Sequence, residues 1–299
     1  MNVLSGVPGV DFAVEDVRPE FPPELEITPL TGPPDATVRV PGSKSVTNRA
    51  LIIAALADGA SRITNPLFAD DSYWLMEALV RLGLEVSADS SQAEVRVKGQ
   101  GGEIGASDVD LFVGNAGTVA RFLPPMLALG RGPYTVDGVP RMRERPIADL
   151  VDAMRQLGAP VEYLREEGRF PLTIEGGGIP GGEAHVSGSK SSQFTSGLLM
   201  AAPYAARYVA LLAKGRKEWP YVGITVALMR QFGVRVERAG GRFAVAPALY
   251  RARDYEVEPD ASGASYFMAA AAVTGGRVRV PGLGSASTQG DLRFAGVLR

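Results

Sequence analysis

The hydrophobic and polar residues of this chain follow one order that returns four times: a short turn with small polar residues, then an apolar run of helical length. The four turns begin near Gly42, Gly114, Gly188 and Asp260. A second marker is a glycine that ends an amphipathic segment, and it recurs every 75 residues, at Gly83, Gly158 and Gly233. A fixed period of this kind indicates repeated supersecondary units.

Each repeat predicts the same elements in the same order: strand, helix, strand, helix and two closing strands. The spacing of apolar residues predicts a first helix over 45–56, and second helices over 71–82, 147–157 and 222–232. Period-two alternation over 84–99 predicts the closing strands of the first unit. The proline-rich, acidic leader predicts a strand only near 25–29. The pattern is typical of an α/β protein built from βαβαββ units.

The fourth unit does not finish within the sequence. By the period, the glycine after its second helix falls just past Arg299, so we expect a truncated product or a fragment. We divide the chain into a leader with the first strand of a split domain (1–42), a three-repeat domain (43–258), and the start of the second, split domain (259–299).

Composition narrows the function classes. The chain has 299 residues, of which 45% are hydrophobic and 21% charged, and its net charge of -2 gives no reason to expect nucleic acid. The apolar runs are too short and too interrupted for a membrane span, and no secretion signal is visible. Cysteine is absent and His185 is the single histidine. This excludes disulfides, cysteine nucleophiles and multi-histidine metal sites within the chain, and it fits a reducing cytoplasm.

The first turn has the residues best suited to bind an anion. Ser43 or Ser45 can cap the helix, Lys44 stands at its mouth, and Arg49 lies one turn further on the face of Ser45. Two cations and a hydroxyl beside free backbone N–H groups suit a phosphate or a carboxylate. The alternative is a capped helix with solvated cations. The glycine spacing before Gly42 is wrong for a P-loop.

The second and third turns offer neutral donors. Two glycines, Gly114 and Gly117, permit close approach of a ligand to the backbone, although tight-turn chemistry alone also explains them. The third turn supplies two hydroxyls and an amide, from Ser191, Ser192 and Gln193. These groups can hold the hydroxyls or the phosphate of a polar ligand, or they can form a serine-rich cap.

Three arginines, Arg141, Arg143 and Arg145, alternate before a helix that begins with Pro146. If the segment is extended, alternation places all three on one side. Basic residues beside the positive end of a helix are unfavourable unless an anion is present, which favours a second anion contact. The alternative is a solvated loop.

Together these motifs resemble the family of the 5-enolpyruvylshikimate-3-phosphate synthases (3-phosphoshikimate 1-carboxyvinyltransferases). The resemblance runs from about Val38 to Arg299 and rests on VPGSKSVTNRALIIAALADG, GNAGTVARF, PRMRERPI, SGSKSSQFTSGLLMAAP and DASGASYFMAAAA, in that order. It implies a two-domain enolpyruvyl transferase fold, an inside-out α/β barrel whose second domain is incomplete here, with the active site in the cleft between the domains.

The resemblance also implies ligands and roles. Enolpyruvyl would pass from phosphoenolpyruvate to the 5-hydroxyl of shikimate 3-phosphate with release of phosphate, by a monomer that needs no metal or organic cofactor. The residues expected to hold shikimate 3-phosphate are Lys44, Ser45, Arg49, Ser191, Ser192 and Gln193. Those expected to hold phosphoenolpyruvate are Lys44, Gly117, Arg141 and Gln193. Lys44 is the expected proton carrier, and Asp260 matches an acidic residue of the family at the hinge of the cleft.

One departure and two alternatives stand beside this reading. Glu218 replaces a serine of the family and would bring a carboxylate near a phosphate. The related enolpyruvyl transferase that acts on UDP-N-acetylglucosamine shares the fold, but it typically has Lys-Asn where this chain has Lys44-Ser45. The other alternative is a catalytically incomplete remnant that only binds shikimate 3-phosphate.

Overall fold

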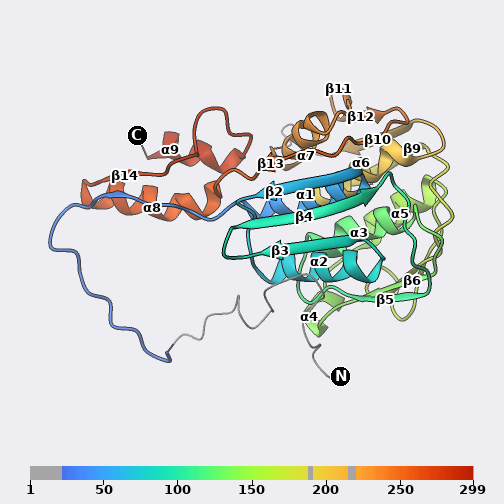
Figure 1. Cartoon of the computed structure of the whole chain (residues 1–299), viewed down its shortest axis with the longest axis horizontal. Coiled ribbons are helices and arrows are strands. Elements are labelled where there is room, and N and C mark those ends of the chain that lie inside the picture. The colour runs from blue at the N-terminus through green and yellow to red at the C-terminus, as the bar shows by residue number, and fades with distance from the viewer. Residues whose placement is uncertain (1–21, 188–190, 215–219, 299) are drawn as a thin grey trace.

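The computed structural model describes residues 22–187, 191–214 and 220–298. Glu218, Trp219 and the start of the third turn, 188–190, therefore lie outside the described residues. The described chain forms a large body of helices and sheets, from which a smaller part with α8 (Ala261–Thr274) extends to one side (Figure 1).

The body consists of three successive units. The first contains α1 (Lys44–Leu56), β2 (Asp58–Thr64), α2 (Asp70–Arg81), β3 (Glu85–Asp89) and β4 (Glu94–Gln100). The second contains β5 (Val109–Phe112), α3 (Val119–Leu127), β6 (Tyr134–Asp137), α4 (Pro140–Arg143), α5 (Ala148–Gln156), β7 (Val161–Tyr163) and β8 (Leu172–Ile174). The third contains β9 (Gly182–Ser187), α6 (Ser192–Ala201), the 3₁₀ turn η1 (Ala202–Tyr204), β10 (Val209–Lys214), α7 (Pro220–Gln231), β11 (Glu237–Ala239) and β12 (Arg242–Val245).

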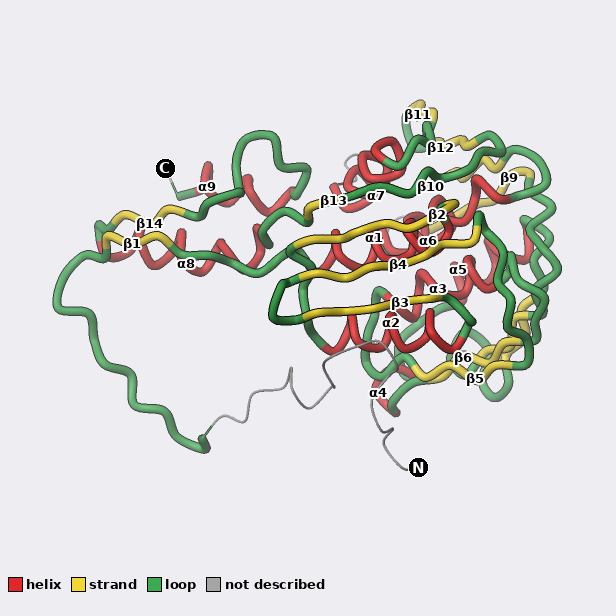
Figure 2. Tube along the Cα trace, in the orientation of Figure 1, coloured by secondary structure: helices red, strands yellow, loops and turns green. Residues whose placement is uncertain are grey.

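The smaller part is made from both ends of the described chain. It contains β1 (Asp35–Thr37), α8, β14 (Arg277–Arg279), the 3₁₀ turn η2 (Gly290–Arg293) and α9 (Phe294–Val297). Strand β1 pairs in parallel with β14, with Ala36 opposite Val278. Figure 2 shows this two-stranded sheet lying along α8, apart from the sheets of the body.

The three units share one sheet topology, with the orders β13-β2-β4-β3, β5-β6-β8-β7 and β11-β12-β10-β9. In the second and third units the first two strands run parallel, and in all three sheets the two closing strands add in antiparallel fashion. The strand that completes the first sheet is β13 (Tyr255–Glu256), which arrives from the far end of the body. The segment before α1 and the segment after β13 thus run side by side from the smaller part to the body, at what we call the crossing. The backbone N–H of Ser43 joins them by donating to the Glu258 carbonyl (2.9 Å).

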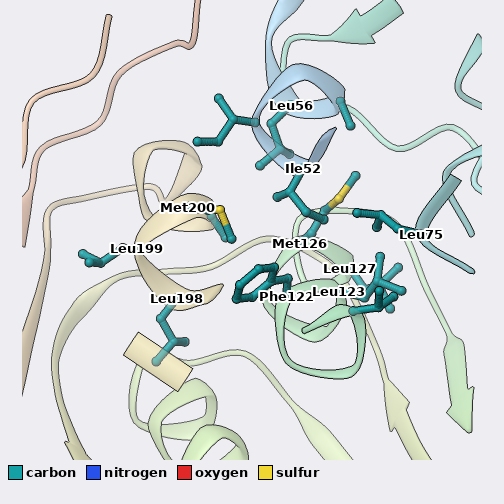
Figure 3. Close-up of a cluster of buried hydrophobic side chains, with 14 of the residues drawn as sticks. Ile52, Leu56, Leu75, Phe122, Leu123, Met126, Leu127, Leu198, Leu199 and Met200 are labelled. Atoms are coloured by element: carbon teal, nitrogen blue, oxygen red, sulfur yellow. The ribbon is translucent and has the colours of Figure 1, made fainter. Parts of the chain in front are cut away.

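The core lies among the first helices of the units, α1, α3 and α6. Residues 46–56 of α1 are buried on every side, which explains why the helix is apolar all round over residues 50–56. Figure 3 shows Ile52 and Leu56 of α1, Phe122 and Met126 of α3 and Leu198 of α6 as members of one buried cluster. Because the second helices cover this core from outside, α2 and α5 are amphipathic instead. Helices α1, α2, α5 and α7 begin and end within two residues of the predicted spans.

The leader departs from the prediction. Residues 25–29 form no strand, and the side chains of Leu25 and Ile27 are 66% and 74% exposed. The first described strand is β1, ten residues further on. Alternation alone does not form a strand where no neighbouring strand offers hydrogen-bond partners, and none of the described sheets extends to these residues. No helix among the described residues is long and apolar enough to cross a membrane.

Candidate active site

One cavity of about 440 Å³ opens where the starts of α1, α6 and α7 meet the turn before α3. Its walls are polar and carry three cationic side chains and one carboxylate. The lining residues are Lys44, Ser45, Arg49, Asp71, Asn115, Gly117, Thr118, Arg145, Ser191, Ser192, Gln193 and Tyr221. Helix starts from all three units therefore converge on one space, and their free N–H groups favour an anion there.

Lys44 is the first residue of α1 and stands at the mouth of the cavity with its side chain 48% exposed. Its Nζ lies 3.8 Å from Oδ1 of Asp71, a loose ion pair. Ser43 occupies the N-cap position, but its side chain makes no capping hydrogen bond. The sequence had offered Ser43 or Ser45 as the residue that caps this helix. The chain crossing supplies the cap instead, since Asp260 Oδ2 accepts a 3.2 Å hydrogen bond from the Lys44 backbone N–H.

Arg49 reaches the cavity from within the core. Its side chain donates from Nε to Thr225 Oγ1 (2.7 Å), from Nη1 to the Ser45 carbonyl (2.7 Å) and from Nη2 to Ser196 Oγ (3.2 Å). Its guanidinium also lies 5.0 Å from the centre of the Phe122 ring. These acceptors are all neutral, and Arg49 forms no ion pair with a carboxylate of the described residues.

Burial lowers the pKa of Arg49 to about 10, so the side chain is still a cation at neutral pH. A buried cation without a counter-ion is unfavourable, and an anion in the adjoining cavity would relieve that cost. Among the lining residues, Arg49 therefore gives the strongest indication that the cavity suits an anion.

Thr118, in the turn before α3, connects Asn48 of α1 to the carboxylate of Asp71. Asn48 Nδ2 donates to Thr118 Oγ1 (2.6 Å), and Thr118 Oγ1 donates to Asp71 Oδ1 (3.1 Å). Gly117 permits a close approach, because an added Cβ would lie 2.5 Å from the guanidinium of Arg145 and that flexible side chain would have to shift. Glycine at this position lets Arg145 lie directly against the turn.

The start of α6 offers short polar side chains. Ser191 is the N-cap, and its Oγ accepts a 3.1 Å hydrogen bond from the backbone N–H of Gln193. Ser192 and Gln193 follow in the first turn, and all three line the cavity. Ser191 is thus both the cap of α6 and part of the cavity wall, so the cap does not exclude the ligand contact predicted for it.

The arginine segment does not have the extended shape that would align its side chains. Pro140 begins the short helix α4, in which Arg141 pairs with Glu144 and is 73% exposed. Arg143 pairs with Asp137, and only Arg145 enters the cavity. Because proline favours the first turn of a helix, alternation does not apply here. The structure therefore does not bring Arg141 to the other predicted site residues.

Asp260 also lies outside the cavity lining. It is the N-cap of α8, where its Oδ1 accepts from Ser262 N (2.8 Å) and Gly263 N (3.0 Å). With Oδ2 turned to the Lys44 backbone, both oxygens bind main-chain N–H groups. This geometry makes Asp260 a tie between the two crossing segments, and it does not favour the catalytic role expected for it.

The sequence assigned no ligand to five lining residues: Asp71, Asn115, Thr118, Arg145 and Tyr221. Arg145 was a candidate only as one of the three alternating arginines. The signal for Asp71 was the pair of acids that opens α2, which also suits any helix start. Tyr221 connects the cavity to the smaller part, because its hydroxyl donates to Asp291 Oδ2 (3.1 Å). Burial, followed by the Asp291 charge, raises the pKa of Tyr221. Asp291 also accepts from Ser262 Oγ (3.0 Å), so this carboxylate joins Tyr221 to the first turn of α8.

Repeated βαβαββ units whose helix starts meet at a cationic cavity define a class: repeat-built α/β proteins with a polar cavity at their converging helix starts. The sequence matches the EPSP synthase (3-phosphoshikimate 1-carboxyvinyltransferase) family over residues 30–299, and the chain belongs to that family.

Curated relatives and a solved structure agree. The 3-phosphoshikimate 1-carboxyvinyltransferase of Trichormus variabilis is 46% identical over 277 residues, which are 92% of this chain and 65% of that protein. The protein of the same name from Erwinia tasmaniensis is 49% identical over 88% of this chain and 63% of its own length. The EPSP synthase structure from Acinetobacter baumannii has a TM-score of 0.78 at 26% identity, over 86% of this chain and 57% of that one. The chain thus spans 63% to 65% of the length of these two curated relatives and 57% of the solved chain.

Proposed function

We propose that this chain binds shikimate 3-phosphate and phosphoenolpyruvate in the cavity and carries out, or contributes to, transfer of the enolpyruvyl group to the 5-hydroxyl of shikimate 3-phosphate. The single observation that carries the proposal is Arg49, a buried cation at the cavity wall whose three acceptors are neutral. Such a group gains most from a dianionic ligand such as a phosphate ester. The family and its named relatives supply the identity of the two substrates.

The lining residues divide into two sets. Shikimate 3-phosphate would lie against Lys44, Ser45 and Arg49 on one side and against Ser191, Ser192 and Gln193 on the other. Phosphoenolpyruvate would lie against Lys44, Gly117 and Gln193, with Arg145 in the place that the sequence assigned to Arg141. This assignment gives each anion at least one guanidinium or ammonium group.

The chemistry needs proton transfer and charge stabilisation. The methylene carbon of phosphoenolpyruvate gains a proton, the 5-hydroxyl oxygen bonds to C2 and loses its proton, and the C2–O bond to phosphate then breaks as a proton leaves the methyl group. Lys44, which can touch both substrates, is suited to carry a proton. Arg49 and Arg145 hold the anions in place and balance the charge of the leaving phosphate. These steps require no metal or organic cofactor.

The same proposal extends to the architecture and the setting. Residues 43–258 would form one domain, and residues 1–42 would join residues 259–299 in a second, with closure over the substrates at the crossing near Ser43 and Glu258. We expect a cytoplasmic monomer.

Calorimetry with shikimate 3-phosphate, followed by phosphate release with both substrates, tests the proposal. We expect saturable heat that disappears in Arg49→Met and is unchanged in Arg131→Gln, an exposed charge-matched control. Phosphate release separates catalysis from binding alone. The absence of heat from the unaltered chain at about millimolar ligand, near the weak limit for a specific small-molecule site, would contradict the proposal.

A further inference from the structure

A second cavity, of about 860 Å³, lies on the outer side of the third unit, and none of its lining residues belongs to the first cavity. It runs between α7 and the β11–β12 hairpin. Helix α7 presents Gly223, Val226 and Arg230 to it, at helical spacing. The opposite face of the same helix carries Tyr221 and Thr225 to the first site. We call the second cavity the outer groove.

Four arginines from separate elements line the outer groove, together with the single acid Glu237. Arg242 pairs loosely with Glu183 (3.6 Å), and Arg238 lies 5.4 Å from the centre of the Phe243 ring. The other two, Arg230 and Arg235, form no ion pair with any carboxylate of the described residues. A cluster of like charges with so little internal compensation favours a ligand that carries several negative charges.

The groove also has room and an apolar surface. An added Cβ at Gly223 would meet no atom within 4 Å, so the wall of α7 is open at that point. Val226, Val236 and Phe243 form an apolar floor, and the 48% exposed ring of Tyr208 stands at the edge. The volume is within the range of small-molecule sites. The groove therefore suits a compact ligand better than a single small ion.

We propose that the outer groove is a binding site for polyphosphate anions, either as an inorganic chain or as the polyphosphate of a nucleotide. Guanidinium groups match phosphate oxygens in pairs, and the spread of Arg230, Arg235 and Arg238 over a helix, a loop and a strand suits successive phosphates. The apolar floor and Tyr208 would accept a planar base. This site is independent of the proposed enolpyruvyl transfer.

Calorimetry on the whole chain with metal-free ATP and with inorganic tripolyphosphate tests this proposal. We expect binding that weakens with salt, and a loss of at least about fivefold in affinity in Arg230→Gln and in Arg235→Gln. Arg131→Gln, an exposed arginine outside the groove, should change it less than about twofold. Tighter binding of ATP than of tripolyphosphate would support a nucleotide as the source of the phosphates. Equal binding would support an inorganic chain.

Two further variants keep the test decisive. Gly223→Leu fills the groove from an open helical position, so it should weaken binding by about tenfold or more without lowering the urea midpoint. Lys44→Gln removes a charge from the first cavity and should leave ATP affinity unchanged. The proposal is overturned if neither anion binds at about 1 mM, if Gly223→Leu has no effect, or if Lys44→Gln abolishes binding.

Discussion

The first two units bury an arginine at the same repeat position, seven residues after Gly42 and seven after Gly114, and use it differently. Arg49 and Arg121 are 1% and 3% exposed. Burial lowers the pKa of each to about 10, helped at Arg121 by the neighbouring charge of Arg145. Arg49 lines the cavity and donates to two side-chain hydroxyls as well as to the Ser45 carbonyl, whereas Arg121 lies behind it.

The partners of Arg121 explain the difference. It donates to the Gly117 carbonyl (3.4 Å) and the Pro146 carbonyl (3.2 Å), and it touches Met142 Sδ (3.2 Å). These contacts join the turn before α3 to the segment that carries Arg145. The comparison teaches that a repeat can place the same cation twice, once against a ligand space and once as a brace for the residues around that space.

The largest effect should come from Arg49→Met. Loss of the buried cation removes a charge-assisted contact to the phosphate, so the affinity for shikimate 3-phosphate should fall by about 100-fold. The free energy of unfolding should stay within about 1 kcal/mol of the parent, because relief of an uncompensated buried charge offsets the hydrogen bonds lost by two hydroxyls and one carbonyl. Calorimetry and urea unfolding measure the two quantities. A variant that unfolds easily yet binds normally would reverse the roles given to the two arginines.

The second prediction separates two arginines of one segment. Arg145→Gln should weaken phosphoenolpyruvate binding by about tenfold, because its guanidinium lines the cavity beside Gly117. Arg141→Gln should change the affinity by less than about twofold, since that exposed side chain pairs with Glu144. Titration of both variants with phosphoenolpyruvate in the presence of shikimate 3-phosphate is the measurement. Equal losses would restore the role that the sequence gave to Arg141.

Arg121→Met should show the opposite balance to Arg49→Met. Two carbonyls lose a donor, which outweighs relief from the Arg145 charge, so we expect a destabilisation of about 1–2 kcal/mol. Affinity for phosphoenolpyruvate should fall only severalfold, through a less firmly held Arg145. Urea midpoints and calorimetry on the same preparations give both numbers. If affinity collapses while the midpoint is unchanged, Arg121 contacts a ligand directly.

The sequence located the site through its repeats. Because the period brings successive helix starts to one end of the fold, Lys44, Arg49 and Gln193 could be assigned to one place, and the structure puts all three in the cavity lining. The pattern also predicted the α/β class and the order of elements.

The pattern of apolar and polar residues could not predict the local backbone shape around Pro140 or the long-range hydrogen bond of Asp260. Alternation cannot show that Pro140 begins a helical turn, which directs Arg141 away from Arg145. Asp260 was assigned because it matches an acidic residue of the family, but its oxygens accept from the backbone N–H groups of its own helix α8 and of the distant Lys44. The choice between Asp70 and Asp71 depends on which first-turn carboxylate faces Thr118, and sequence spacing does not determine this.

The third unit supplies the smallest and most discriminating test of the comparison. Its residue at the equivalent position, seven after Gly188, is Thr195, which is fully buried. Among the described residues its Oγ1 has no hydrogen-bond partner. A buried hydroxyl without a partner costs free energy, so Thr195→Val, which keeps the branched shape, should stabilise the chain by about 1 kcal/mol.

The matched control is Thr225→Val, which removes a hydroxyl that accepts from Arg49 Nε and donates to Ser196 Oγ. That variant should instead lose stability and weaken shikimate 3-phosphate binding. Urea unfolding of both variants, with and without the ligand, compares them directly. If Thr195→Val destabilises the chain and impairs binding as Thr225→Val does, then the third unit also directs this position at the ligand, and the division between a ligand-facing and a bracing copy does not hold.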